Sequence, residues 1–90
     1  MLQLFTEHLG GAEDALLRTV GDSLYVRYAN DPAVLKITAQ RGSADETRVT
    51  LQLIHPDHGP IDSGRFTQTR SQDSLTALKQ LDAYLDIWFV

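Results

Sequence analysis

The sequence predicts an α+β fold, in which an antiparallel meander sheet of four or five strands has one face covered by a long C-terminal helix and a short N-terminal helix. Three observations support this prediction. Apolar residues near the C-terminus recur at three- and four-residue steps, which is helical spacing. Three central segments alternate apolar and polar residues, as half-buried strands do. Turn-forming residues separate these segments, and the connections are as short as hairpins require.

The C-terminal helix has the clearest pattern. Ser71 is a suitable N-cap, and Asp73 falls in the first turn, where a negative charge favours the helix dipole. The apolar stripe that follows consists of Leu75, Leu78, Leu81, Leu85 and Trp88. This stripe predicts an amphipathic helix of about five turns, packed against one face of the sheet.

Strands are predicted over residues 24–28, 34–40 and 47–53, each with one apolar and one polar face. A fourth strand is predicted over residues 61–68, where Gly64 interrupts the pattern and marks a candidate bulge. The residues between these segments, such as Asn30-Asp31-Pro32, are typical of turns.

The first twenty residues leave one alternative open. Leu2, Phe5 and Leu9 suit a short helix that ends at Gly10-Gly11. Residues 12–20 fit either a helix or a strand over 16–20, paired with 24–28 through a turn at Gly21-Asp22. We favour the strand because this turn is a strong hairpin signal.

Length and composition limit the function. A chain of 90 residues predicts a single domain, residues 1–90, with a thin core and little room for a deep pocket. Its 42% apolar and 22% charged residues argue against a disordered chain. The absence of cysteine excludes disulfides, thiolate zinc sites and cysteine nucleophiles. A net charge of −4 argues against a general nucleic-acid binder.

No part of the sequence predicts contact with a membrane. The longest apolar run, residues 87–90, is far shorter than a membrane span. The N-terminal residues lack the basic region and cleavage pattern of a signal peptide. We therefore expect a cytoplasmic protein.

One loop gathers residues that bind metals. His55, Asp57 and His58 lie close together, and Asp62 follows. Structural zinc sites usually draw their ligands from two separated pairs, and the same residue types are common in polar turns. We therefore expect no metal and no cofactor.

Catalytic patterns are equally weak. Ser63 lies near His58 and Asp57, but the sequence has no Gly-x-Ser-x-Gly elbow and no glycine-rich phosphate loop. Asp82 and Asp86 stand one helical turn apart, as two residues on a solvated helix face also would. We therefore expect a protein that is not an enzyme.

The polar face of the predicted sheet is the main candidate for binding. Its members carry basic or hydrogen-bonding side chains and none is acidic: Tyr25, Arg27, Lys36, Thr38, Gln40, Arg48, Thr50 and Gln52. Arg and Tyr are enriched at the energetic centres of protein interfaces. Apart from Gln40, these residues form the predicted partner-binding site. The alternative is an ordinary solvent-facing sheet surface, on which Thr, Lys, Arg and Gln are also common.

The end of the chain is a second candidate surface. Ile87, Trp88 and Phe89 cannot all lie on one helix face, so the core or a partner has to cover some of them. Trp88 and Phe89 either close the core or form a homodimer contact.

These patterns favour a small non-catalytic module that binds another protein, such as an inhibitor, an immunity protein or a regulatory subunit. In size and architecture the chain resembles the compact inhibitors of phages and mobile elements, anti-CRISPR proteins among them, and no motif adds to that resemblance. The alternative is nucleic-acid binding through Tyr25, Arg27, Lys36 and Arg48, although the pair of stacking aromatics expected of such sheets is missing.

Overall fold

The computed structural model describes residues 1–43 and 45–89. The elements along the chain are α1 (Leu2–Leu9), β1 (Ala15–Val20), β2 (Ser23–Tyr28), β3 (Val34–Arg41), β4 (Glu46–His55), β5 (Gly59–Thr69) and α2 (Ser74–Trp88). Ala44 and Val90, which belong to the predicted connection 41–45 and the apolar run 87–90, lie outside the described residues.

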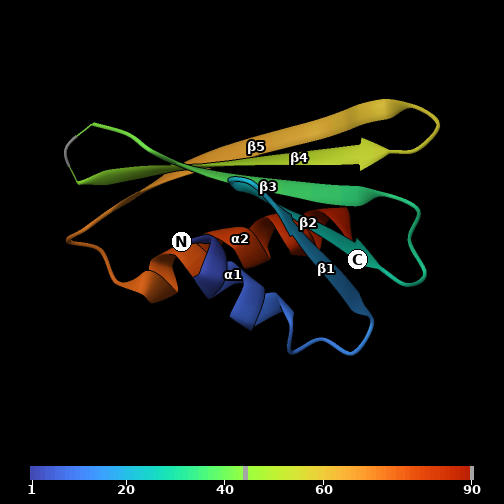
Figure 1. Ribbon diagram of the computed structural model, residues 1–90, viewed down its shortest axis with the longest axis horizontal. Coiled ribbons are helices and arrows are strands. Elements are labelled where there is room, and N and C mark those ends of the chain that lie inside the picture. The colour runs from blue at the N-terminus through green and yellow to red at the C-terminus, as the bar shows by residue number, and fades with distance from the viewer. Residues whose placement is uncertain (44, 90) are drawn as a thin grey trace.

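The five strands form one antiparallel sheet in the order β1-β2-β3-β4-β5, so each strand pairs with its neighbours in sequence. Both helices lie on the same side of the sheet (Figure 1). The predicted α+β meander is therefore confirmed, in its five-stranded form. We call the side that carries the helices the inner face and the opposite side the outer face.

Residues 15–20 form a strand rather than part of a helix, as we favoured. Val20 pairs with Ser23, and Gly21-Asp22 make the two-residue turn between β1 and β2. Gly21 has a φ of 60°, a backbone conformation that glycine adopts without steric cost. The short N-terminal helix also forms, and it ends at Leu9 before Gly10.

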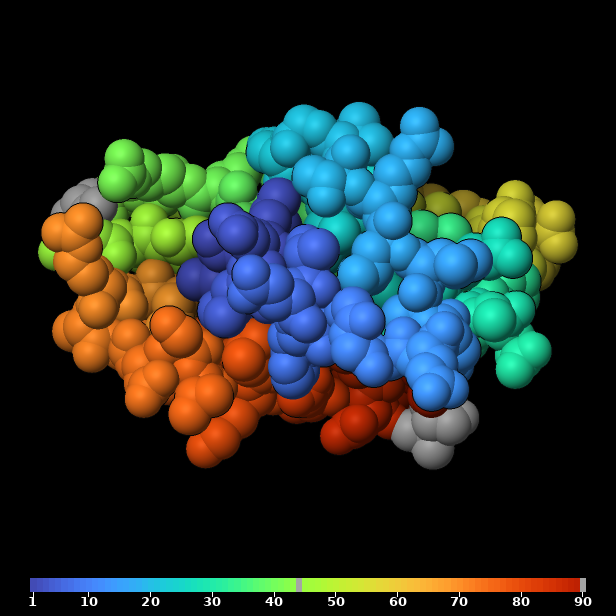
Figure 2. All heavy atoms as spheres, turned by 60° about the horizontal axis from the view of Figure 1, so that its bottom comes forward, coloured from blue at the N-terminus to red at the C-terminus, as the bar shows by residue number. Residues whose placement is uncertain are grey.

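The core lies between the inner face and the two helices. The sheet contributes fully buried side chains from its middle strands: Leu24, Val26, Leu35, Ile37, Val49 and Leu51. From α1, Phe5 sets its ring edge against Phe66 of β5, with the ring centres 6.4 Å apart. Ala77 and Leu81 of α2 are completely buried. Figure 2 shows α1 lying between α2 and the N-terminal strands, so the two helices cover the sheet together.

The start and the buried stripe of α2 differ from the prediction. The N-cap is Asp73, whose Oδ1 accepts a hydrogen bond from the backbone N–H of Leu75 at 3.0 Å, and Ser71 lies outside the helix. Leu75 is 58% exposed rather than in the core. At about 100° per residue, Leu75 lies on the side of the helix opposite Ala77, which together with Leu81 marks its buried centre.

The sequence suggested a bulge at Gly64, but the structure has none at this residue. The register shift lies where Leu53 and Ile54 pair with Asp62 and Pro60, which leaves Ile61 as the extra residue. Gly64 pairs regularly with Leu51, and a Cβ at this position would overlap the ring of Tyr84. Glycine at position 64 therefore allows α2 to pack closely on β5.

Candidate functional site

The structure places all seven predicted partner-binding residues on the outer face. Tyr25, Lys36 and Gln52 form one row across β2, β3 and β4, and Thr38 and Thr50 pair in the next row. Arg27 and Arg48 lie on the same face, toward opposite ends of the sheet. Each of the seven is exposed or partly exposed. Their common face follows from the two-residue period of the strands.

The outer face also holds two arginines that the sequence analysis missed. Arg18 of β1 pairs with Tyr25, and Arg65 of β5 pairs with Thr50, so both extend rows of the predicted site. Arg18 lies on the outer face between the exposed Leu16 and Val20, a two-residue period that the strand interpretation of β1 already contained. The side of Arg65 depends on the bulge at Ile61, which the sequence did not locate.

Charge is unevenly divided between the two sides of the protein. The outer face carries five of the eight Lys and Arg residues: Arg18, Arg27, Lys36, Arg48 and Arg65. The chain has twelve acidic residues, but only Glu46, at the beginning of β4, belongs to the strand positions of this face. This corrects the expectation that no strand residue of the face is acidic.

None of these five cations forms an ion pair within residues 1–43 and 45–89. There, Arg70 pairs with Asp45 at 3.8 Å, the His8 ring forms a hydrogen bond with Asp82 at 2.9 Å, and neither contact involves a cation of the outer face. The Lys36 Nζ lies 5.9 Å from the centre of the Tyr25 ring, within the range of a cation–π contact. Within the described ranges, therefore, no carboxylate pairs directly with a cation of the outer face.

The outer face is hollowed rather than flat. One hollow of about 290 Å³ lies between Lys36, Gln52 and Ser63, and another of about 490 Å³ lies beside Arg48 and Arg65. Gln40 and Thr50 line both hollows, so the two hollows adjoin and together form a depression across β3, β4 and β5. We call this depression the outer groove. A further hollow of about 410 Å³ adjoins Arg18, Val20 and Tyr25.

The histidines of the β4–β5 connection face each other without gathering a third ligand. The rings of His55 and His58 are 4.7 Å apart, and His55 Nδ1 accepts a hydrogen bond from the backbone N–H of Asp57 at 3.1 Å. Asp62 is engaged elsewhere, since its Oδ2 accepts a hydrogen bond from Trp88 Nε1 at 2.9 Å. In the part of the chain that the structure describes, no cluster of three or more His, Cys, Asp or Glu side chains is placed to hold a metal ion.

The other residues considered for catalysis, Ser63 and the pair Asp82 and Asp86, form no catalytic arrangement among the described residues. The backbone N–H of Ser63 donates to the carboxylate of Asp62, and no described hydrogen bond links Ser63 with His58. Asp82 accepts a hydrogen bond from His8 across the two helices, at 2.9 Å, rather than acting together with Asp86. These contacts connect elements of the fold.

Trp88 and Phe89 close one end of the core. The Trp88 ring lies 5.1 Å from that of Tyr84, and the Phe89 ring lies 4.9 Å from that of Tyr28. Both side chains are partly buried, whereas Ile87 is 72% exposed. A homodimer through Trp88 and Phe89 stays a prediction, and Ile87 is the residue of this region most open to a partner.

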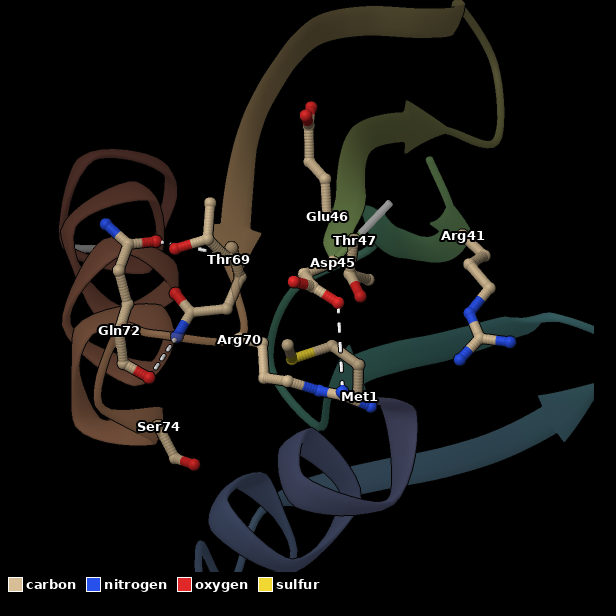
Figure 3. A pocket seen from close by; sticks show the side chains of 10 residues that line it. Met1, Arg41, Asp45, Glu46, Thr47, Thr69, Arg70, Gln72 and Ser74 are labelled. Carbon is tan, nitrogen blue, oxygen red and sulfur yellow. Dashed lines mark hydrogen bonds and ion pairs between the residues drawn. The ribbon is translucent and has the colours of Figure 1, made fainter. Parts of the chain in front are cut away.

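A polar hollow of about 280 Å³ lies at the end of the sheet where β5 leads into α2 (Figure 3). It contains charges of both signs, and Arg70 lies against Asp45. Glu46 and Arg41 lie apart from that pair (Figure 3). Because these groups do not converge on one point, the outer groove is the stronger candidate site.

Comparison of the chain with protein-family models, curated proteins and solved structures finds no match. Neither helix of the described ranges has the length and apolar character needed to cross a membrane.

Proposed function

We propose that this protein is a small non-catalytic module that binds another protein through its outer face, in the manner of an inhibitor or immunity protein. The observation that carries the proposal is the segregation of five cations onto a face that no helix covers (Figure 1). Folding requires the inner face to be apolar, but it does not require cations to gather on the outer face. Binding to a partner is a direct reason for such an arrangement.

The composition of the outer face supports a protein partner. Arg and Tyr, which dominate binding energy at protein interfaces, are present together with the hydrogen-bonding side chains of Thr38, Thr50 and Gln52. The groove is shallow and polar, which suits contact with another surface better than enclosure of a small molecule. Within this proposal the resemblance to anti-CRISPR inhibitors remains one of size and architecture. We place the protein in the cytoplasm, where a chain without cysteine is chemically at home.

Nucleic-acid binding is the second candidate, and Tyr25 is the observation that favours it. Its ring lies among Arg18, Arg27 and Lys36, a combination that can stack a base and contact phosphates. A sheet that binds RNA usually offers two or three stacking aromatics, and Tyr25 is the single aromatic among the outer strand positions. Protein binding is therefore the function we favour.

The test is capture of a partner by the native protein from a lysate of its source cells, with a charge-reversed variant beside it. In Arg27→Glu/Arg48→Glu, two cations of the outer face become acidic. We expect the wild type to retain one stoichiometric protein, identified by mass spectrometry. The variant should weaken binding at least about tenfold, which corresponds to about 1.4 kcal/mol.

The matched control is Arg70→Glu/Lys79→Glu, which makes the same change in net charge away from the outer face. The control should retain the partner, and both variants should keep the circular dichroism spectrum of the wild type. Absence of a stoichiometric partner, or equal capture by the outer-face variant, would contradict the proposal. Oligonucleotides retained in place of protein would favour the second candidate.

A further inference from the structure

The two hollows of the outer groove each carry cations, and neutral polar side chains of β3 and β4 lie between Lys36 and Arg48. Lys36 lies at one end, in the same row as Arg18 and Tyr25. Arg48 and Arg65 line the other hollow as diagonal neighbours on β4 and β5, and Arg65 pairs with Thr50 in the middle row. The neutral hydrogen-bonding groups of the groove on β3 and β4 are Thr38, Gln40, Thr50 and Gln52.

The register gives the separation of the two ends. Lys36 pairs with Gln52, and Arg48 lies further along the same strand as Gln52. With a rise of about 3.3 Å per residue and a strand spacing of about 4.8 Å, the backbone positions of Lys36 and Arg48 are roughly 14 Å apart. An extended peptide covers that distance in about four residues. Residues separated by this number point to the same side of an extended chain.

We propose that the outer groove binds an extended acidic segment of the partner protein, with one acidic group at the Lys36 end and another, about four residues away, at the Arg48–Arg65 end. The inference rests on the proposed function and names the chemistry that the same site recognises. The carboxylates of the segment pair with the cations at the two ends, since none of these cations has an ion-pair partner among the described residues. The polar groups of the segment that lie between its two acidic groups contact Thr38, Thr50 and Gln52.

The distribution of charge favours a peptide over a nucleic acid. A nucleic-acid strand carries a phosphate about every 3.4 Å in a duplex, and it is best matched by a continuous run of cations. The groove instead has neutral side chains on β3 and β4 between Lys36 and Arg48, and Glu46 lines it beside Arg48 and Arg65. A carboxylate at that point repels a continuous polyanion, whereas a peptide can place a backbone N–H or a hydroxyl there. The net charge of −4 also opposes the approach of a long polyanion.

Two fluorescent peptides of the same composition test the spacing. The sequence Glu-Glu-Thr-Val-Thr-Glu-Glu places acidic pairs at both ends, and its β-branched centre favours an extended chain. The isomer Glu-Glu-Glu-Glu-Thr-Val-Thr carries its acids together. Fluorescence polarisation at low salt should show that the spaced peptide binds the 90-residue protein about tenfold more tightly than the isomer.

Variants of the protein identify the groove as the site. Arg48→Glu/Arg65→Glu should weaken binding of the spaced peptide about tenfold, whereas Arg70→Glu/Lys79→Glu should leave it unchanged. Equal affinity for the two peptides would overturn the spacing. Absence of binding to either peptide at low salt would overturn recognition of an acidic segment. Tighter binding of a single-stranded oligonucleotide that depends on Arg48 and Arg65 would overturn the peptide in favour of nucleic acid.

The peptide and partner-capture experiments together distinguish a failure of this inference from a failure of the proposed function. If the peptides fail while a partner is captured and then lost in Arg27→Glu/Arg48→Glu, the outer face binds protein by another chemistry. If no partner is captured either, the proposed function fails together with this inference.

Discussion

The two faces of the sheet are built from the same strands, yet they obey different constraints. On β4, Val49 and Leu51 are completely buried, whereas their neighbours Arg48 and Thr50 are exposed. The inner face has to be apolar because its burial stabilises the fold. The outer face faces solvent, so folding requires only that its residues be polar and sets no preference for their charge. A strong bias on the outer face therefore calls for a reason other than folding. The grouping of its cations is such a bias, and it is why we assign binding to this face.

Substitutions at two neighbouring residues of β4 should show the largest difference in stability between the two faces. Leu51→Ala removes a fully buried side chain and should lower the free energy of unfolding by about 2–5 kcal/mol. Thr50→Val keeps a β-branched residue on the outer face and should change the free energy of unfolding by about 0.5 kcal/mol or less. Urea denaturation of both variants measures the difference. Similar losses in the two variants would mean that the outer face also carries much of the stability.

A second test uses neighbouring positions on β5. Gly64→Ala places a methyl group against the ring of Tyr84, and overpacking of this kind should lower the stability by about 1–3 kcal/mol. Ser63→Ala, on the outer side of the same strand, should have a much smaller effect. Thermal unfolding followed by circular dichroism compares them.

The ring of Tyr84 provides the control for that test. Gly64→Ala/Tyr84→Leu removes the ring, so the penalty for the added methyl group should largely disappear relative to Tyr84→Leu alone. If the methyl group costs as much without the ring, the close packing of α2 is not the reason for glycine at position 64.

The fold was predictable because its main signals are periodic. Alternation in β2, β3 and β4 and the stripe on α2 each indicate a buried side, and the short turns leave a meander as the simplest topology. The pattern was less informative wherever burial depends on another element. Leu75 has the spacing of a core residue, but it lies on the side of α2 opposite Ala77.

Gly64 is a second residue whose role depends on another element of the fold and could not be predicted from the pattern alone. A glycine that interrupts a strand looks alike in sequence whether it forms a bulge or admits a neighbouring ring. Only the docking of Tyr84 distinguishes the two, and the bulge itself lies at Ile61, which has no special residue type.

The candidate site was predictable in its residues but not in its shape. Strand alternation alone places the seven predicted residues together on the outer face. Arg65 could not be assigned without the bulge, because one extra residue moves every later side chain to the other face. The shape of the outer groove depends on how side chains of three strands pack beside one another. The two-residue period predicts which face a residue lies on, but it does not predict that shape.

The smallest effect concerns a titratable group on the inner face. Burial, and then the negative charges of Asp14 and Asp82, raise the pKa of Tyr28 above its ordinary value of 10.0. The unfolded chain therefore releases the phenol proton before the folded protein does. The stability that neutral Tyr28 contributes is complete below its unfolded pKa and is lost as the pH rises toward its folded pKa.

Tyr28→Phe removes this titration and retains a ring for Phe89 to pack against. Between about pH 9 and 11, the variant should lose less stability than the wild type in urea denaturation. Parallel losses in the two proteins would show that the pKa of Tyr28 is the same in the folded and unfolded chains.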